Sequence, residues 1–228
     1  ATAKTKKIDL GFKTVFPGFI DAHSHPAYSG IKHLKMVDCD LRSIKDIQTA
    51  IKQRAAITPK GKWVEGFKYD DTKTIEGRKI TMADLDAAAP DHPVRITHRG
   101  GHTYYCNSLA FKMAGVDENT PNPQGGEFEK TADGKLTGCT KEAASDVFDK
   151  IVPDASTRSE RQEGVKIISK MMAKTGITSV TDAGGNPESL QAYEDAYEAG
   201  ELDVRIYCMI RYMHIDKMIA AGVRTGMG

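Results

Sequence analysis

The sequence has 228 residues, enough to bury the core of one large domain or two small ones. Its 39% hydrophobic and 28% charged residues exclude a disordered chain, and no apolar stretch approaches the roughly 20 residues that span a bilayer. The 32 Lys and Arg residues nearly balance 31 Asp and Glu residues, so the net charge of +1 gives no general attraction to nucleic acid or anionic lipid. We therefore expect a cytoplasmic globular protein with a small-molecule substrate and no nucleic-acid or membrane partner.

The four cysteines are widely separated, at Cys39, Cys106, Cys139 and Cys208. No C-x-x-C pair occurs, which argues against a zinc knuckle, a redox motif and a dense disulfide framework, so we expect free thiols. The basic N-terminal segment lacks the apolar core of a signal peptide, and it also lacks an initiator Met. We expect the chain to be processed or to be part of a longer one.

In the first half, short apolar strands are predicted to alternate with capped helices. Ser43 and Asp46 have the spacing of a helix N-cap, and Thr81 and Asp84 repeat it. In chain order, we expect a strand at 19–22, a helix from 43 to about 57, a strand at 63–67, a helix from 81 that ends before 90, a strand at 93–97 and a helix at 108–115. Asp133-Gly134 then predicts a β-hairpin, which we expect to be an insertion that decorates a β/α framework.

The second half is more regular. Thr157 and Glu160 form a capping box that opens a helix of about 158–174, and the β-branched run that follows predicts a strand ending at Asp182. Asn186 and Pro187 are an N-cap and an N1 proline for a helix that ends near 200, and 202–210 is apolar enough for a strand buried on both faces. This alternation predicts β/α units around a parallel sheet.

The sharpest local feature is the segment PGFIDAHSHP at 17–26. Residues i and i+2 of a strand point the same way, so His23 and His25 would present two imidazoles from one face, as a divalent metal requires. About 0.2 His-x-His pairs are expected by chance in such a chain, so the spacing alone is weak evidence. The pair follows an apolar strand, however, and β/α proteins collect catalytic groups at the carboxyl ends of their strands.

This segment resembles the first-strand motif of the amidohydrolase superfamily, whose members are metal-dependent hydrolases on a distorted (β/α)8 barrel. Further stretches are similar, in order and spacing, to amidohydrolase family 3, the branch of the YtcJ-like proteins and the N-substituted formamide deformylases. These stretches are a Trp63 segment, Leu85-Asp86-x-x-x-Pro90, His92-Pro93-Val94, Gly101-His102, Asn107-Ser108-x-Ala110, Pro123-x-Gly125-Gly126, Asp133-Gly134 and Thr137-Gly138. The similarity runs from about Lys13 to the last residue.

The resemblance implies an α/β fold that is a partial (β/α)8 TIM barrel of the metal-dependent hydrolase type, with an inserted β-hairpin and helical segment. Residues 1–228 would be the N-terminal part of the barrel domain, with an insertion-rich segment at about 60–155. The rest of the barrel and most of a small β-sandwich, usual in the family, would be absent. The general base, which the family carries on a late strand, would be absent as well. We therefore expect this portion to be inactive alone.

The same resemblance assigns candidate site residues. His23 and His25 would be metal ligands, and Glu142 would be a further ligand or an orienting carboxylate, unless it is an exposed acid in the first turn of a helix. His102 would contact substrate or support its glycine-rich loop, and Asp182 would face substrate or start a turn. The cofactor would be one or two divalent ions, zinc first, although two imidazoles also suit other metals.

The implied function is hydrolysis of a C–N bond in a small-molecule amide or formamide. A metal held by neutral imidazoles lowers the pKa of bound water to about 7 and polarises the carbonyl. The alternative is a non-catalytic domain of the same fold that binds a small ligand or a partner, which would fold alone without exposed hydrophobic surface. Open sheet edges would also favour a homo-oligomer.

Overall fold

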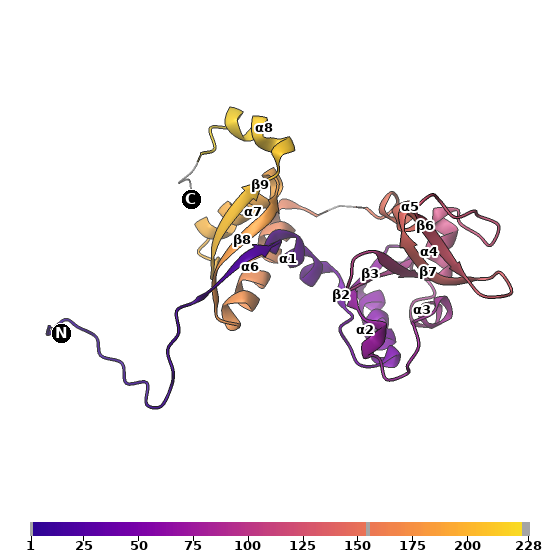
Figure 1. Cartoon of the computed structure of the whole chain (residues 1–228), viewed down its shortest axis with the longest axis horizontal. Coiled ribbons are helices and arrows are strands. Elements are labelled where there is room, and N and C mark those ends of the chain that lie inside the picture. Colours follow the sequence, from indigo (N-terminus) through magenta and orange to yellow (C-terminus); the bar gives the residue numbers. More distant parts are fainter. Residues whose placement is uncertain (1, 154–155, 225–228) are drawn as a thin grey trace.

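Two β-sheets organise the chain. The computed structural model describes residues 2–153 and 156–224, and Figure 1 shows the two sheets in separate lobes, with an extended N-terminal segment beyond one of them. No helix in these described ranges is long and apolar enough to cross a bilayer. We refer to the lobes as the three-stranded lobe and the six-stranded lobe.

The three-stranded lobe contains a sheet in the order β1-β8-β9, and both strand pairs are parallel. Its strands are β1 (Phe19–Ser24), β8 (Ile177–Gly185) and β9 (Arg205–Ile210). Its helices are α1 (Pro26–Lys35), α6 (Arg158–Lys174), α7 (Pro187–Glu198), the 3-10 helix η3 (Tyr212–His214) and α8 (Ile215–Ala220). Strands β1 and β8 are neighbours in this sheet although the whole six-stranded lobe separates them in the sequence.

Helices α1, α6 and α7 cover one face of this sheet. Val180 of β8 packs against Ile168 and Met172 of α6, and α1 and α6 approach so closely that a Cβ on Gly30 would lie 2.2 Å from the Gly164 carbonyl oxygen. On the opposite face, alternate residues of β9 are exposed. The sheet is therefore closed by helices on one side only.

The six-stranded lobe has a mixed sheet in the order β2-β3-β4-β5-β7-β6, in which β2, β3 and β4 are parallel and the other pairs are antiparallel. Its strands are β2 (Val37–Asp38), β3 (Val64–Tyr69), β4 (Val94–His98), β5 (Thr103–Cys106), β6 (Gly126–Lys130) and β7 (Leu136–Glu142). Its helices are α2 (Ile44–Ile57), η1 (Asp71–Lys73), α3 (Met82–Ala88), α4 (Ser108–Ala114), η2 (Ala143–Ser145) and α5 (Asp146–Asp149). Fully buried side chains such as Val64, Tyr69 and Ile96 form its core.

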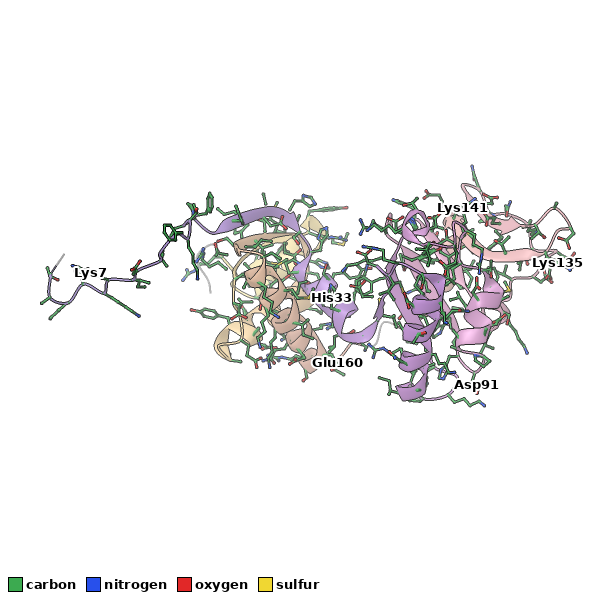
Figure 2. All side chains as sticks on the ribbon, turned by 90° about the horizontal axis from the view of Figure 1, so that it is seen from below. Lys7, His33, Asp91, Lys135, Lys141 and Glu160 are labelled. Carbon is green, nitrogen blue, oxygen red and sulfur yellow. The ribbon has the colours of Figure 1, made fainter. Side chains whose placement is uncertain are left out.

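Helix α1 also connects the lobes. Its His33 ring packs edge-on against Phe67 of β3, with 5.0 Å between ring centroids, and burial lowers the pKa of His33. Figure 2 shows His33 where α1 approaches the six-stranded lobe and Lys7 far out on the N-terminal segment. This contact packs the C-terminal part of α1 against the six-stranded lobe.

Most predicted elements are confirmed, including the N-cap Thr81, the capping box of Thr157 and Glu160, and the helix 158–174. The predicted hairpin is confirmed as β6 and β7, and β7 pairs with β5, so the hairpin extends the six-stranded sheet. That it is an insertion in a β/α framework stays a prediction. One expectation is wrong. The strand at 202–210 begins only at Arg205 and is not buried on both faces, because helices cover just one side of its sheet. The fold is α/β, with two sheets in place of one continuous β/α framework.

Candidate metal centre

His23 and His25 lie at the carboxyl end of β1, directly before α1. The Asp21 carboxylate accepts the backbone N–H of His23 at 3.1 Å, and Pro26 occupies the first position of α1, where its missing N–H has no consequence. The two imidazole rings are exposed neighbours, with 5.6 Å between centroids and an angle of 80° between planes. The strand therefore delivers two adjacent imidazoles, as the i, i+2 spacing predicts.

Asp182 lies beside this pair on the neighbouring strand β8. Its Oδ1 atom is 3.5 Å from Nδ1 of His25, a distance longer than an ordinary hydrogen bond. The Asp182 side chain is only 4% exposed, whereas that of His25 is 45% exposed. Asp182 is therefore a buried carboxylate next to the exposed histidine, and its Oδ1 accepts the Gly184 N–H at 3.1 Å, as the turn alternative predicts. Its contact with substrate stays a prediction.

His102 and Glu142 form a second pair, on the six-stranded lobe. Nδ1 of His102 is 3.2 Å from Oε2 of Glu142, and the Glu142 backbone N–H donates to the His102 carbonyl oxygen at 2.8 Å. Both side chains are exposed. Glu142 has a φ of 49°, a left-handed conformation that is rare for residues other than glycine, and it precedes η2, not a regular α-helix. The predicted site residues thus form two groups, one on each lobe.

A set of three metal-ligand atoms within 4.8 Å of one another occurs elsewhere, at Asp70, Asp71 and His98. Within the described ranges no other three His, Cys, Asp or Glu residues meet this criterion, so Glu142 does not join His23 and His25 in such a set. The sequence did not single out Asp70 and Asp71, although both lie where β3 ends beside β4. Their position at adjacent strand ends was the available signal.

The hydrogen bonds of His98 oppose metal binding by this set. Its Nδ1 accepts the Gly100 N–H at 3.1 Å, so the proton of the neutral ring is on Nε2, which lies 3.3 Å from Asp71. A metal-bound histidine usually has the opposite arrangement, with Nδ1 as the donor. The ring nitrogen that faces Asp71 therefore offers a proton and no free lone pair.

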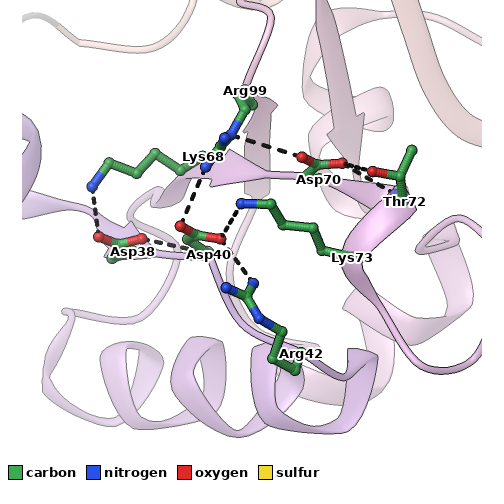
Figure 3. Close-up of polar contacts among 8 residues, drawn as sticks. All are labelled: Asp38, Asp40, Arg42, Lys68, Asp70, Thr72, Lys73 and Arg99. Carbon is green, nitrogen blue, oxygen red and sulfur yellow. Dashed lines mark hydrogen bonds and ion pairs between the residues drawn. The ribbon is translucent and has the colours of Figure 1, made fainter.

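Cations also neutralise the acids around this set (Figure 3). Asp40 contacts Arg42 and Lys73, which lower its pKa to about 2, and Arg99 lies between Asp40 and Asp70. Lys68 pairs with Asp38 at 2.9 Å. These ion pairs join the ends of β2, β3 and β4. Because the cations balance the charge of the acids, the network can have this structural role without a bound ion.

The cysteines add no metal ligands to either group. Cys39, Cys106 and Cys139 are buried, Cys208 is half-buried, and all four are free thiols, as expected. Burial raises the pKa of Cys139 to about 11 and that of Cys208 to about 12. Because the thiolate is the form that binds metal, these groups are poor ligands at neutral pH.

Comparison with known proteins assigns the chain to a family. Residues 6–225 match the amidohydrolase family. The chain is 30% identical to N-substituted formamide deformylase of Arthrobacter pascens over 208 residues, which cover 89% of this chain and 38% of that protein. It is 31% identical to the putative amidohydrolase YtcJ of Bacillus subtilis (strain 168) over 224 residues, which cover 94% of this chain and 41% of that one.

The fold is also found in a solved structure. An uncharacterized metal-dependent hydrolase from Pyrococcus horikoshii OT3 superposes with a TM-score of 0.59 at 23% identity, over 90% of this chain and 39% of that one. The chain thus spans about two-fifths of the length of each of these proteins. The match over nearly all of its residues shows that the chain belongs to the amidohydrolase family.

Proposed function

We propose that this chain supplies the first metal ligands of a hydrolase that cleaves C–N bonds in amides or formamides. The observation that carries the proposal is the exposed pair His23 and His25 at the carboxyl end of β1. Membership of the amidohydrolase family supports it, as does the name of the deformylase relative, which points to formamides as one substrate class.

The residues at this end of β1 fit a divalent ion. Nδ1 of His25 faces the Asp182 carboxylate, and a metal-ligating histidine typically directs one ring nitrogen to a carboxylate and the other to the metal. Because the His25 side chain is 45% exposed, the metal-facing nitrogen has room for an ion. Two neutral imidazoles suit zinc well and several other first-row ions in different measure.

The proposed chemistry divides between the ion and the chain. When bound, the ion would acidify a water molecule and polarise the scissile carbonyl. His23 and His25 would hold it, with Glu142 as the proposed further ligand and His102 as the proposed substrate contact. None of the described residues is assigned as the general base, which we place in the part of the relatives outside the matched region.

We further propose that β1, β8 and β9 are an arc of a (β/α)8 barrel, with the six-stranded lobe inserted after its first unit. The parallel order of the strands and the helices on one face support this arrangement. Phe19, Ile20 and Tyr207 are each at least 60% exposed. The alternative, a stand-alone binding domain, expects no such apolar exposure, so these residues count against it.

The proposal is tested by metal content and turnover. We expect the full chain, purified without chelator, to contain a stoichiometric divalent ion by mass spectrometry. We expect a longer protein, in which this chain is joined to a segment that corresponds to the unmatched part of its relatives, to hydrolyse N-formyl or N-acyl amines. His23→Ala and His25→Ala should lower metal content and turnover by more than the roughly 10- to 100-fold that loss of a supporting residue produces.

His214→Ala is the matched control, because His214 lies in η3 of the same lobe and, among the described residues, no side-chain hydrogen bond or ring contact joins it to the pair. It should leave metal content and turnover unchanged. Absence of bound ion, together with unchanged turnover in His23→Ala, would overturn the proposal.

A further inference from the structure

A buried chain of hydrogen bonds lies beneath His25. The Tyr193 hydroxyl on α7 donates to Oδ2 of Asp182 at 2.6 Å, and the same hydroxyl oxygen accepts the Ala27 N–H of α1 at 2.9 Å. The Gly184 N–H donates to Oδ1 of Asp182 at 3.1 Å. Residues from β8 and α7 therefore donate to one carboxylate next to the exposed histidine, and α1 holds the tyrosine that donates to it.

The directions of these hydrogen bonds are determined by their donors. A backbone N–H can only donate, so the Tyr193 oxygen accepts from Ala27 and its own proton points to Asp182. Burial raises the pKa of Tyr193, with a further contribution from its hydrogen bond to Asp182, so this proton is retained. The carboxylate accepts from Tyr193 and Gly184, and its remaining lone pairs are available to Nδ1 of His25.

Close packing also fixes the ring position. A Cβ on Gly184 would lie 3.2 Å from both Cε1 and Nδ1 of His25, so the imidazole rests almost directly on the β8 backbone. His25 is the N-cap residue of α1, yet its side chain makes no capping hydrogen bond. The ring is thus free to pair with Asp182. It can occupy this position because Gly184 has no side chain there.

We infer that Asp182, held in place by Tyr193, is a positioning residue that fixes His25 with its proton on Nδ1 and leaves Nε2 free to bind the metal. This inference rests on the proposed function, because it takes His25 as a ligand. It gives Asp182 a supporting role in place of contact with substrate. The present separation of 3.5 Å is expected to shorten when Nε2 binds an ion, because the metal makes the Nδ1 proton a stronger donor.

The first test needs no metal. Two-dimensional NMR of the 15N-labelled full chain without metal at one neutral pH reports which nitrogen of His25 carries the proton, and His25→Gln identifies the signals. We expect the Nδ1–H form in the native protein and a shift toward Nε2–H in Asp182→Asn, whose amide cannot accept from Tyr193, Gly184 and His25 together. Tyr193→Phe, which removes only a hydroxyl, should give a smaller shift in the same direction.

The second test is metal affinity, measured for zinc by competition with a chromophoric chelator. Asp182→Asn should bind zinc about 10- to 100-fold more weakly than the native chain, the range for loss of a supporting partner, and Asp182→Glu should recover part of that loss. Tyr193→Phe should also weaken binding measurably, by up to about 10-fold. If Asp182→Asn does not fold, Tyr193→Phe decides between the outcomes by itself.

Matched controls lie in the other lobe. Asp84→Asn removes a carboxylate that also accepts several hydrogen bonds, and Tyr69→Phe removes a buried hydroxyl that also accepts a backbone N–H. Neither should change the His25 proton position or zinc affinity. Unchanged NMR signals and affinity in Asp182→Asn and Tyr193→Phe would overturn the inference while the proposed function stands. If Asp182→Asn loses the Nδ1–H form of His25 but the native chain binds no divalent ion, the pairing is supported and the proposed function is overturned.

Discussion

The two lobes bury their sheets to different degrees. In the six-stranded lobe, Val64, Tyr69 and Ile96 are completely buried on adjacent strands. In the three-stranded lobe, β9 alternates exposed and half-buried residues, and Ile20 of β1 is exposed. A parallel sheet usually has both faces covered, so the three-stranded lobe depends heavily on the single layer of helices that it has.

The candidate metal ligands His23 and His25 lie on this less enclosed lobe. His23, His25 and Asp182 lie at the carboxyl ends of β1 and β8, and their relative positions depend on how α1 and α7 pack on that sheet. The acids and bases at the strand ends of the six-stranded lobe instead neutralise one another. Substitutions that disturb one lobe alone can show how far the two are independent.

The largest expected effect comes from the contact between α1 and α6. A Cβ on Gly30 would lie 2.2 Å from a carbonyl oxygen of Gly164, so Gly30→Ala must push the helices apart and should lower the free energy of unfolding by about 3 kcal/mol. Trp63, the single tryptophan, packs in the six-stranded lobe. In urea, the circular-dichroism transition should therefore move to lower denaturant while the Trp63 fluorescence transition stays in place.

Gly100→Ala is the control for this substitution. Gly100 lies in the six-stranded lobe outside the left-handed region, and its Cβ would meet only the His98 ring at an ordinary 3.4 Å. Its unfolding should resemble that of the native chain. If Gly30→Ala shifts the Trp63 transition as far as the circular-dichroism transition, the lobes unfold as one unit and the comparison fails.

A smaller effect is expected from the ion group around Arg95 in the six-stranded lobe. The Arg95 guanidinium is largely buried, pairs with Glu65 and Asp149, and lies over the Tyr104 ring at 4.9 Å. Arg95→Met leaves the largely buried Glu65 without its cation, which should lower stability by about 2 kcal/mol, less than for a fully buried pair because Asp149 is half exposed. The Trp63 transition should report this loss.

Arg158→Met tests the specificity of that result. Arg158 makes a bidentate ion pair with Asp195 in the three-stranded lobe, but the Arg158 side chain is exposed. Loss of an exposed pair should change stability by less than about 1 kcal/mol. Adding Glu65→Gln to Arg95→Met should restore part of the lost stability, and no restoration would contradict an unpaired-charge explanation.

The sequence predicted what short-range chemistry determines. Thr157 with Glu160 and the Asp133-Gly134 turn lie within a few residues of the elements they define, and these predictions are confirmed. The i, i+2 spacing likewise placed the two imidazoles side by side. Helix α1 was not predicted, although Pro26 at its first position was a usable signal.

Long-range pairing could not be derived in the same way. Nothing local states that β5 lies between β4 and β7, so the pairing of the hairpin with the six-stranded sheet was not predicted. Nor does the segment around Tyr193 indicate that its hydroxyl reaches Asp182 and the start of α1. Those contacts arise only when α7 packs on the sheet, so the supporting part of the site was beyond sequence reasoning.

The smallest expected effect concerns Asp84, in the capping box of α3. Arg78 donates to its carboxylate and, with hydrogen bonds from Thr81, lowers the pKa of Asp84 from its ordinary 3.8 to about 2. Stability from this lowered pKa is present above pH 4 and is lost as the pH falls toward 2. Asp84→Asn should therefore lower stability at pH 7 by about 1 kcal/mol, a modest value because Arg78 is half exposed. Urea unfolding of both proteins, followed by Trp63 fluorescence, should give a smaller difference at pH 3 than at pH 7. An equal difference at both pH values would show that the charge of Asp84 does not stabilise the six-stranded lobe.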